Sequence, residues 1–283
     1  MIIKRAKSLG FCFGVKKAIK QAEKTKDAST IGPLIHNNDE ITRLYADYNV
    51  KTINGIDELS NEKKAIIRTH GITKNDLMLL EKKGIEIIDA TCPFVKKPQE
   101  IVEKMSLEGY DIVIFGDLDH PEVKGVKSYA TTNAYVVLEP CELENIKLKN
   151  KVAVVSQTTK KVENFIKIVN FLLTKVKEVR VFNTICDATF KNQEAIKELS
   201  LASDVVVVVG GKNSSNTKQL FLIAKNNCKD SYLVENEFEL KKEWFFGKSI
   251  CGISAGASTP EWIIKKVEDK ILSFDKNYKI YSD

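Results

Sequence analysis

The sequence predicts an α/β fold with mostly parallel sheets, organised as three similar small units. Short β-branched runs alternate with stretches whose apolar residues recur every three or four positions, and this alternation is typical of α/β layers. Residues 205–209 are apolar throughout, as expected of a parallel strand buried on both faces. A chain of 283 residues is long enough for one large domain or for two to three small ones.

The expected elements can be placed in order along the chain. Strands are predicted at 65–69, 85–90, 111–116, 151–156 and 204–211. Helices are predicted at 15–24, 99–109 and 162–176. Pro93 and Pro98 precede the second of these helices, so we expect that helix to begin only after Pro98.

Three segments resemble one another and suggest the length of each unit. In each, an apolar or β-like stretch ends in a cysteine and a lysine-containing helical pattern follows: "GFCFGVKKAIKQA" at Cys12, "DATCPFVKKPQEIV" at Cys92 and "NTICDATFKNQEAI" at Cys186. The separations are 92 − 12 = 80 and 186 − 92 = 94 residues. We expect domains at 13–92, 93–185 and 186–283, with the N-terminal strand 1–12 packing near the centre. Chance similarity of strand–loop–helix segments remains an alternative.

Composition limits the partners and the compartment. The net charge of 44 − 38 = +6 is mild, and the scarcity of arginine argues against sequence-specific nucleic-acid binding. The N-terminus lacks the apolar stretch of a signal peptide, and no apolar run approaches the length of a membrane span. We therefore expect a cytoplasmic protein without a nucleic-acid or membrane partner. Its six cysteines are then expected to be reduced thiols rather than three disulfides.

The cysteines fall into two groups. Cys12, Cys92 and Cys186 precede predicted helices, where the helix dipole favours a thiolate. Three such thiolates could hold one metal centre and leave a coordination position for substrate, although the spacing alone favours three unrelated reduced thiols. The other cysteines lack this context: Cys141 and Cys228 are expected in surface or loop positions, and Cys251 in a buried strand.

The three histidines share a position in the pattern. His36, His70 and His120 each follow an apolar, strand-like run and lie among glycine, proline or asparagine. Ligands of open α/β sheets bind beyond the carboxyl ends of the strands, which is where these loops are expected. Glu122 follows His120 across Pro121, and such a loop can hold an acid near a substrate oxygen. Structural or exposed histidines remain the alternative.

Further strand-end loops are rich in hydroxyls and amides. "VVSQTTK" carries Thr158, "VVVVVGGKNSSNT" carries Ser214, Ser215 and Asn216, and "GISAGASTP" carries Ser258. A strand followed by Gly-Gly, Ser or Asn and a helix can form an anion nest, although plain N-capping explains any one loop as well. The spacing of a Walker A loop is absent, so a nucleoside triphosphate is not implied.

The ordered set of these motifs resembles one known family over essentially the whole chain. "GFCFGV", "HN" at His36, "RTHG", "DATCP", "HPEVKG", "SQTT", "NTICDAT", "GGKNSSNT" and "SAGASTP" occur in the order found in the LytB, or IspH, family of 4-hydroxy-3-methylbut-2-enyl diphosphate reductases. Two positions depart from the family's usual pattern, Asn192 and Asp119, and neither carries an assigned role.

The resemblance implies a fold, a cofactor and a reaction. It implies a trefoil of three α/β domains around a central 4Fe–4S cluster, with Cys12, Cys92 and Cys186 as ligands and one iron open for the allylic alcohol of the substrate. It implies a two-electron, two-proton reductive dehydroxylation that yields isopentenyl and dimethylallyl diphosphates, the final step of the non-mevalonate pathway. Electrons would come from an external one-electron donor such as ferredoxin or flavodoxin.

The resemblance also implies roles for single residues. Glu122 matches the proton donor, Thr158 the hydroxyl beside it, and His120 a catalytic position that also lines the diphosphate pocket. The positions that match the diphosphate site are His36, His70, His120, Ser214, Ser215, Asn216 and Ser258.

Two other functions use the same features. A non-redox dehydratase would use the open iron as a Lewis acid alone. An iron–sulfur redox sensor or electron carrier would usually saturate its cluster with four protein ligands.

Overall fold

The computed structural model describes residues 1–59, 63–274 and 279–280, and within these ranges all strands lie in three parallel sheets. The first sheet has the order β11 (Ser231–Val234), β10 (Val205–Val209), β12 (Ile250–Ala255), β1 (Ile2–Arg5) and β13 (Lys279–Ile280). The second has the order β3 (Val50–Ile53), β2 (Ala28–Ile31), β4 (Lys64–Ile67) and β5 (Glu86–Asp89). The third has the order β7 (Ala134–Val137), β6 (Asp111–Phe115), β8 (Lys151–Ser156) and β9 (Glu178–Val181). The predicted α/β class with parallel sheets is confirmed.

The described helices alternate with these strands along the chain. Their bounds are α1 (Phe13–Thr25), α2 (Asn38–Tyr48), α3 (Lys74–Lys82), α4 (Pro93–Leu107), α5 (Pro121–Lys127), α6 (Val162–Lys175), α7 (Asp187–Leu201), α8 (Ser215–Asn227) and α9 (Glu261–Ser273), with short 3-10 turns at Ile56–Glu58, Pro140–Leu143, Glu237–Glu239 and Lys242–Phe245. In the described part of the chain, every helix is too short or too polar to cross a membrane.

The chain forms two compact units. Unit 1 comprises Met1–Lys16, Ile35–Thr42 and Asp187–Asp283, and unit 2 comprises Lys17–Leu34 and Arg43–Cys186. The first sheet belongs to unit 1, whereas the second and third sheets belong to unit 2. The domain boundaries at 13–92, 93–185 and 186–283 and the trefoil arrangement stay predictions.

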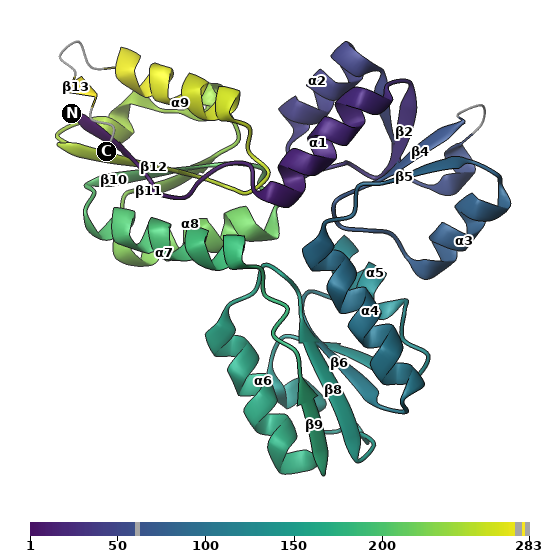
Figure 1. The fold of residues 1–283 in the computed structure, drawn as a ribbon. Helices are drawn as coiled ribbons and strands as arrows, with labels where there is room; N and C mark the ends of the chain where they lie inside the picture. Colours follow the sequence, from purple (N-terminus) through teal and green to yellow (C-terminus); the bar gives the residue numbers. More distant parts are fainter. Residues whose placement is uncertain (60–62, 275–278, 281–283) are drawn as a thin grey trace. The chain divides into compact units, whose positions relative to one another are not determined.

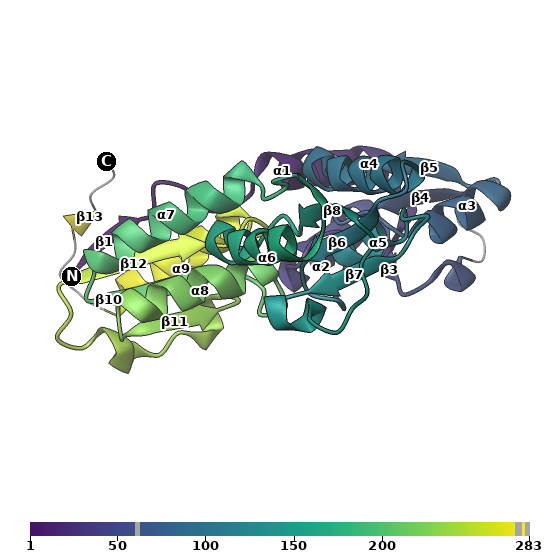
Figure 2. The same cartoon turned by 90° about the horizontal axis from the view of Figure 1, so that it is seen from below.

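The sheet of unit 1 is covered by helices on both faces. Val205, Val207 and Val209 of β10 pack with α9, whereas the alternate residues Val206 and Val208 pack with α7 and α8. Seen from below in Figure 2, α7 and α8 lie in front of this sheet. Because successive side chains of a strand point to opposite faces, a strand covered on both sides must be apolar throughout. Each fully buried valine contributes about 1.5–3 kcal/mol.

The third sheet, in unit 2, repeats this organisation. Ile112 and Ile114 of β6 pack with α4 and α5 on one face, and Val113 and Phe115 pack with α6 on the other (Figure 1). The second sheet has its own core, in which Leu80 of α3 packs with strand residues such as those of β4. The strand ends that carry the candidate loops are therefore anchored by buried cores.

The start of α4 differs from the prediction. Pro93 is the first residue of the helix and Cys92 is its N-cap, so α4 begins before Pro98 rather than after it. A proline is tolerated in the first turn, where the backbone N–H has no intrahelical partner. Pro98 lies inside the helix and is buried. Its missing N–H removes one backbone hydrogen bond of the helix, while its buried ring contributes to packing.

Candidate active site

A buried acid lies at the centre of the candidate site in unit 2. Glu122 belongs to the first turn of α5, and His120 caps that helix by accepting a hydrogen bond from the Glu122 amide at its Nδ1, with a distance of 3.2 Å. The Glu122 side chain is 2% exposed. Thr158 donates to both carboxylate oxygens, from its amide to Oε1 and from its hydroxyl to Oε2, each at 2.7 Å. The loop after β8 therefore fixes both oxygens of the carboxylate.

Burial changes the acidity of this carboxyl group. Desolvation raises the pKa of Glu122 to about 7, while the two hydrogen bonds from Thr158 and the cation of Lys160 oppose the shift. A carboxyl group with a pKa near the working pH can hold a proton and release it during a reaction. Glu122 therefore has the properties of a general acid.

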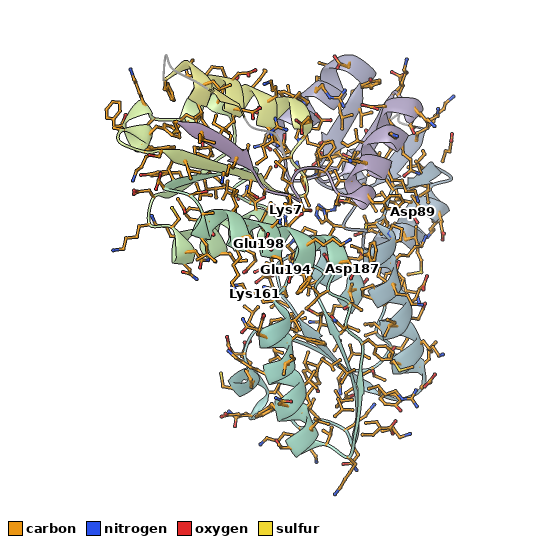
Figure 3. All side chains as sticks on the ribbon, turned by 60° about the vertical axis from the view of Figure 1, so that its left-hand side comes forward. Lys7, Asp89, Lys161, Asp187, Glu194 and Glu198 are labelled. Carbon is orange, nitrogen blue, oxygen red and sulfur yellow. The ribbon has the colours of Figure 1, made fainter. Side chains whose placement is uncertain are left out.

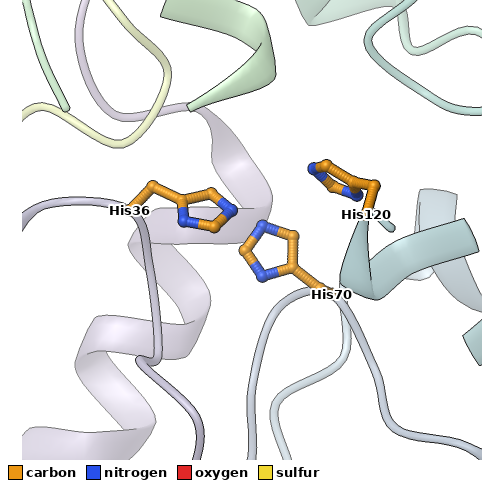
Figure 4. A group of neighbouring side chains, drawn as sticks. All are labelled: His36, His70 and His120. Atoms are coloured by element: carbon orange, nitrogen blue, oxygen red, sulfur yellow. The ribbon is translucent and has the colours of Figure 1, made fainter. Parts of the chain in front are cut away.

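Two of the predicted histidines lie together in unit 2. The rings of His70 and His120 meet edge to face with centroids 5.6 Å apart (Figure 4). His70 lies in the turn after β4, and His120 precedes α5, so both occupy the strand-end loops that the sequence predicted.

Backbone hydrogen bonds connect these loops to two of the predicted cysteine ligands. The Cys92 amide donates to the carbonyl of Thr69, next to His70, at 3.0 Å. The Cys186 amide donates to the carbonyl of Thr158, also at 3.0 Å. In unit 2, hydrogen bonds therefore connect Cys186 to Thr158 and Thr158 to Glu122. The loop of His70 lies beside Cys92.

Unit 1 holds the remaining predicted residues. The amide of Cys12 donates to the carbonyl of Ala257 at 3.2 Å, which places Cys12 beside the loop of Ser258. Ser214 is the N-cap of α8 and accepts a hydrogen bond from the Thr217 amide at 3.3 Å, so its hydroxyl has a structural role there.

The start of α8 and the loop before it have two further features: the buried side chain of Asn216 and the close approach of Gly211 to His36. Asn216 is 5% exposed, and neither polar atom of its side-chain amide has a hydrogen-bond partner among the described residues. A buried amide without a partner is costly, and a polar ligand at the N-terminus of α8 would satisfy it. A Cβ on Gly211 would lie 2.3 Å from the carbonyl oxygen of His36, so only glycine lets this loop approach His36.

The thiols suit a metal centre. None of the six cysteines, all of which lie in the described residues, forms a disulfide, and Cys12, Cys92 and Cys186 are half-buried at the starts of α1, α4 and α7. Thiolates are soft ligands for iron–sulfur clusters, and a helix N-terminus stabilises their charge. The donor set therefore fits the cluster that the resemblance implies.

The other cysteines have different surroundings. Cys141 is exposed, as expected, and Cys251 is buried in β12, where burial raises the pKa of its thiol to about 12 with a smaller effect of Cys228. Cys228 lies in the loop that follows α8, which is one of the two positions expected, but it is not at the surface. It is buried, because it ends α8 and packs against the core under that helix.

One pair of residues near the acid has no signature in the sequence. The Lys160 ammonium lies 2.9 Å from Oδ1 of Asp117, and the Lys160 side chain is only 9% exposed. A lysine between a threonine pair and another lysine gives no sequence signal of burial, because such runs normally face solvent.

The model of the LytB protein family matches residues 3–272. The chain belongs to the LytB family. This LytB chain is 74% identical over 280 residues to the 4-hydroxy-3-methylbut-2-enyl diphosphate reductase of Campylobacter jejuni subsp. jejuni serotype O:23/36 (strain 81-176), covering 99% of this chain and 100% of that protein. It is 71% identical to the reductase of the same name from Campylobacter lari, covering 98% of this chain and 99% of that one.

Solved structures agree with the assignment to the LytB family. One is (E)-4-hydroxy-3-methyl-but-2-enyl diphosphate reductase, described as the terminal enzyme of the non-mevalonate pathway; it is 41% identical, with a TM-score of 0.72, covering 96% of this chain and 99% of that chain. Another is the E-1-hydroxy-2-methyl-but-2-enyl-4-diphosphate reductase from Plasmodium falciparum, which is 26% identical with a TM-score of 0.90, covering 99% and 91% of the two chains. The LytB chain is thus an enzyme of the oxidoreductase class, as its sequence predicted.

Proposed function

We propose that the chain reduces (E)-4-hydroxy-3-methylbut-2-enyl diphosphate to isopentenyl and dimethylallyl diphosphates, the final step of the non-mevalonate isoprenoid pathway. Two electrons and two protons enter, the allylic C–O bond breaks, and water leaves. The observation that carries this proposal is the buried Glu122 carboxyl, whose oxygens accept both hydrogen bonds of Thr158 and whose pKa is raised to about 7 by burial. Hydroxide is a poor leaving group, so the reaction needs such an acid.

The cofactor that fits is one 4Fe–4S cluster held by Cys12, Cys92 and Cys186, with one iron lacking a protein ligand. When bound, the cluster supplies one-electron transfer and Lewis acidity. The half-buried thiols at three helix starts support this ligand set.

The diphosphate is bound by neutral and titratable groups rather than by arginine. The buried Asn216 amide without a partner and the N-terminus of α8 support an anion site in unit 1. The residues that we assign to the diphosphate are His36, His70, His120, Ser214, Ser215, Asn216 and Ser258.

Glu122 and Thr158 deliver the proton. Because the Thr158 amide donates to Oε1, the acidic proton resides on Oε2, where the Thr158 hydroxyl also binds. When Oε2 carries the proton, its hydrogen bond with the Thr158 hydroxyl reverses, so that Oε2 donates to the hydroxyl and the hydroxyl can donate to the leaving oxygen. His120 stabilises this turn as the N-cap of α5.

An external one-electron donor such as ferredoxin or flavodoxin supplies the electrons. The enzyme works in the cytoplasm, where cysteines remain reduced.

Anaerobically purified protein, assayed with dithionite, a mediator dye and the allylic diphosphate, tests the proposal. We expect isopentenyl and dimethylallyl diphosphates as products. Formation of a diene without net reduction would contradict the reductase and support a dehydratase.

A ligand substitution tests the cofactor assignment separately. We expect Cys186→Ser to lose most of its bound iron and its turnover, because a hydroxyl is a poor substitute for a thiolate. Cys141→Ser is the matched control, since Cys141 is exposed and precedes no long helix. Full iron content and turnover in Cys186→Ser would remove Cys186 from the ligand set.

A further inference from the structure

An ion pair between a buried lysine and a partly exposed aspartate lies close to the acid of the candidate site. Lys160 Nζ is 2.9 Å from Oδ1 of Asp117, with the lysine side chain 9% exposed and the aspartate side chain 41% exposed. The Lys160 ammonium also lies 6.0 Å from the centroid of the Phe115 ring. A lysine buried to this degree is rare without a specific role in packing or electrostatics.

The pair joins the two turns that carry Glu122 and Thr158. Asp117 belongs to the turn after β6, and its carbonyl accepts a hydrogen bond from the His120 amide at 3.0 Å, immediately before the turn of Glu122. Lys160 belongs to the turn after β8, and its amide donates to the Gln157 carbonyl at 3.2 Å, so it closes the turn that contains Thr158.

Gln157 connects the same two turns a second time. Its side-chain Oε1 accepts a hydrogen bond from the Asp117 amide at 2.9 Å, and its own amide donates to the Phe115 carbonyl at 2.8 Å. Gly116 makes room for this side chain, because a Cβ there would lie 3.0 Å from Gln157 Oε1. The ion pair, the amide side chain and the backbone therefore form one connected clamp.

We propose that Lys160 and Asp117 are a positioning pair for the proton donor: the pair holds the Thr158 turn against the Glu122 turn, and its charge balance sets the proton affinity of Glu122. The inference rests on the proposed function, since it concerns the acid of that reaction. Neither residue is assigned a contact with substrate.

The charges of the pair act on Glu122 in opposite directions. Among the described residues, Lys160 from the loop after β8 is the charged side chain that acts on this carboxyl, and it lowers its pKa. Asp117 from the loop after β6 neutralises that cation. The titratable rings beside the turn of Glu122 are His120, which caps its helix, and His70, from the turn after β4, whose ring meets that of His120.

Two substitutions then have opposite effects. Lys160→Met removes the cation, so Glu122 should keep its proton to higher pH. Asp117→Asn leaves the cation without its counterion, so Glu122 should lose its proton at lower pH. We expect the alkaline limb of the plot of turnover against pH to move by roughly 1 pH unit in each variant. The limb should move to higher pH in Lys160→Met and to lower pH in Asp117→Asn. The double variant should return close to the wild-type limb.

Lys161→Met is the matched control. Lys161 is the next residue and the N-cap of α6, where its side chain is labelled in Figure 3. The substitution removes the same charge one position away, and we expect the limb to stay in place. Lys160→Arg should keep the wild-type limb, because it keeps the cation.

The closing experiment measures turnover of the cluster-loaded full chain against pH, together with an infrared titration of the Glu122 carboxyl assigned by its loss in Glu122→Gln. Opposite shifts in Lys160→Met and Asp117→Asn support the pair. Lower turnover in both with unmoved limbs and unmoved carboxyl titration would overturn it, as would an equal shift in Lys161→Met. If the wild type does not turn over the allylic diphosphate, the proposed function fails, while the infrared titration still decides the pair. Because Asp117 is partly exposed, its variant remains decisive if Lys160→Met does not fold.

Discussion

The side chain of Glu122 makes two hydrogen bonds with Thr158 that a glutamine can replace, provided that the hydroxyl turns to accept rather than donate. In Glu122→Gln, Oε1 can accept from the Thr158 amide, and the new Nε2 can donate to the Thr158 hydroxyl, so the buried site keeps its hydrogen bonds. The variant cannot release a proton. We expect turnover to fall by about 10²-fold or more while substrate affinity changes little. Steady-state kinetics and calorimetric titration with the diphosphate measure both quantities, and near-normal turnover would exclude Glu122 as the acid.

At the residue scale, sequence patterns identified groups that lie in loops after strands. The three histidines could be proposed because histidine is rare in the chain and each one follows an apolar run, and Glu122 because it follows His120 across Pro121. The Lys160–Asp117 pair could not, because burial of a lysine depends on which turn of a distant segment packs over it. The buried position of Cys228 was missed for the same reason: the residue ends a helix, and only the packing under α8 buries it.

At the scale of elements, the regular patterns were predictable and the helix boundary was not. The five apolar residues of β10 predict a strand covered on both faces, and α7, α8 and α9 cover it. The helix at Cys92 was placed too late, because Pro98 fits inside α4 while Pro93 begins it. A proline near a helix start thus predicts the boundary only to within about two turns.

The loop between β10 and α8 gives a prediction at the same scale. In Gly211→Ala, the new Cβ would lie 2.3 Å from the carbonyl oxygen of His36, so one of the two backbones must move. We expect the KM for the diphosphate to rise by roughly tenfold, equivalent to about 1.4 kcal/mol of lost binding. Gly55→Ala is the control, because a Cβ at Gly55 meets no atom within 4 Å. Unchanged KM in Gly211→Ala would show that this approach does not matter for binding.

For the whole molecule, the sequence predicts that strands form parallel sheets covered by helices. It does not predict which loops from distant strands contact one another. The alternation of strand and helix patterns predicts parallel sheets, and the three similar segments suggest three units; the structure has three parallel sheets. The hydrogen bonds that join Cys186 to Thr158, and Thr158 to Glu122, connect residues from separate strand ends. Periodicity contains no information on such pairings. The family motifs predicted the Thr158 hydroxyl beside Glu122, but not the backbone hydrogen bond between Cys186 and Thr158.

The raised pKa of Glu122 also makes the stability of the whole chain depend on pH. The folded protein holds this proton up to a pKa of about 7, whereas the unfolded chain releases it near the usual value of 4.5. Stability from this group is therefore fully present below pH 4.5 and is lost as pH rises through 7. The loss amounts to at most about 3 kcal/mol in the free energy of unfolding.

Glu122→Gln isolates the contribution of Glu122 to the pH dependence of stability, because glutamine does not titrate. The contributions of the other titratable groups are the same in both proteins and cancel in the difference. We expect the unfolding free energy of the wild type, relative to the variant, to fall by roughly 2–3 kcal/mol between pH 5 and pH 8. Chemical denaturation of both proteins at the two pH values measures the difference. If that difference is independent of pH, the carboxyl is ionised in the folded protein at neutral pH, and Glu122 then lacks the proton that the reaction requires.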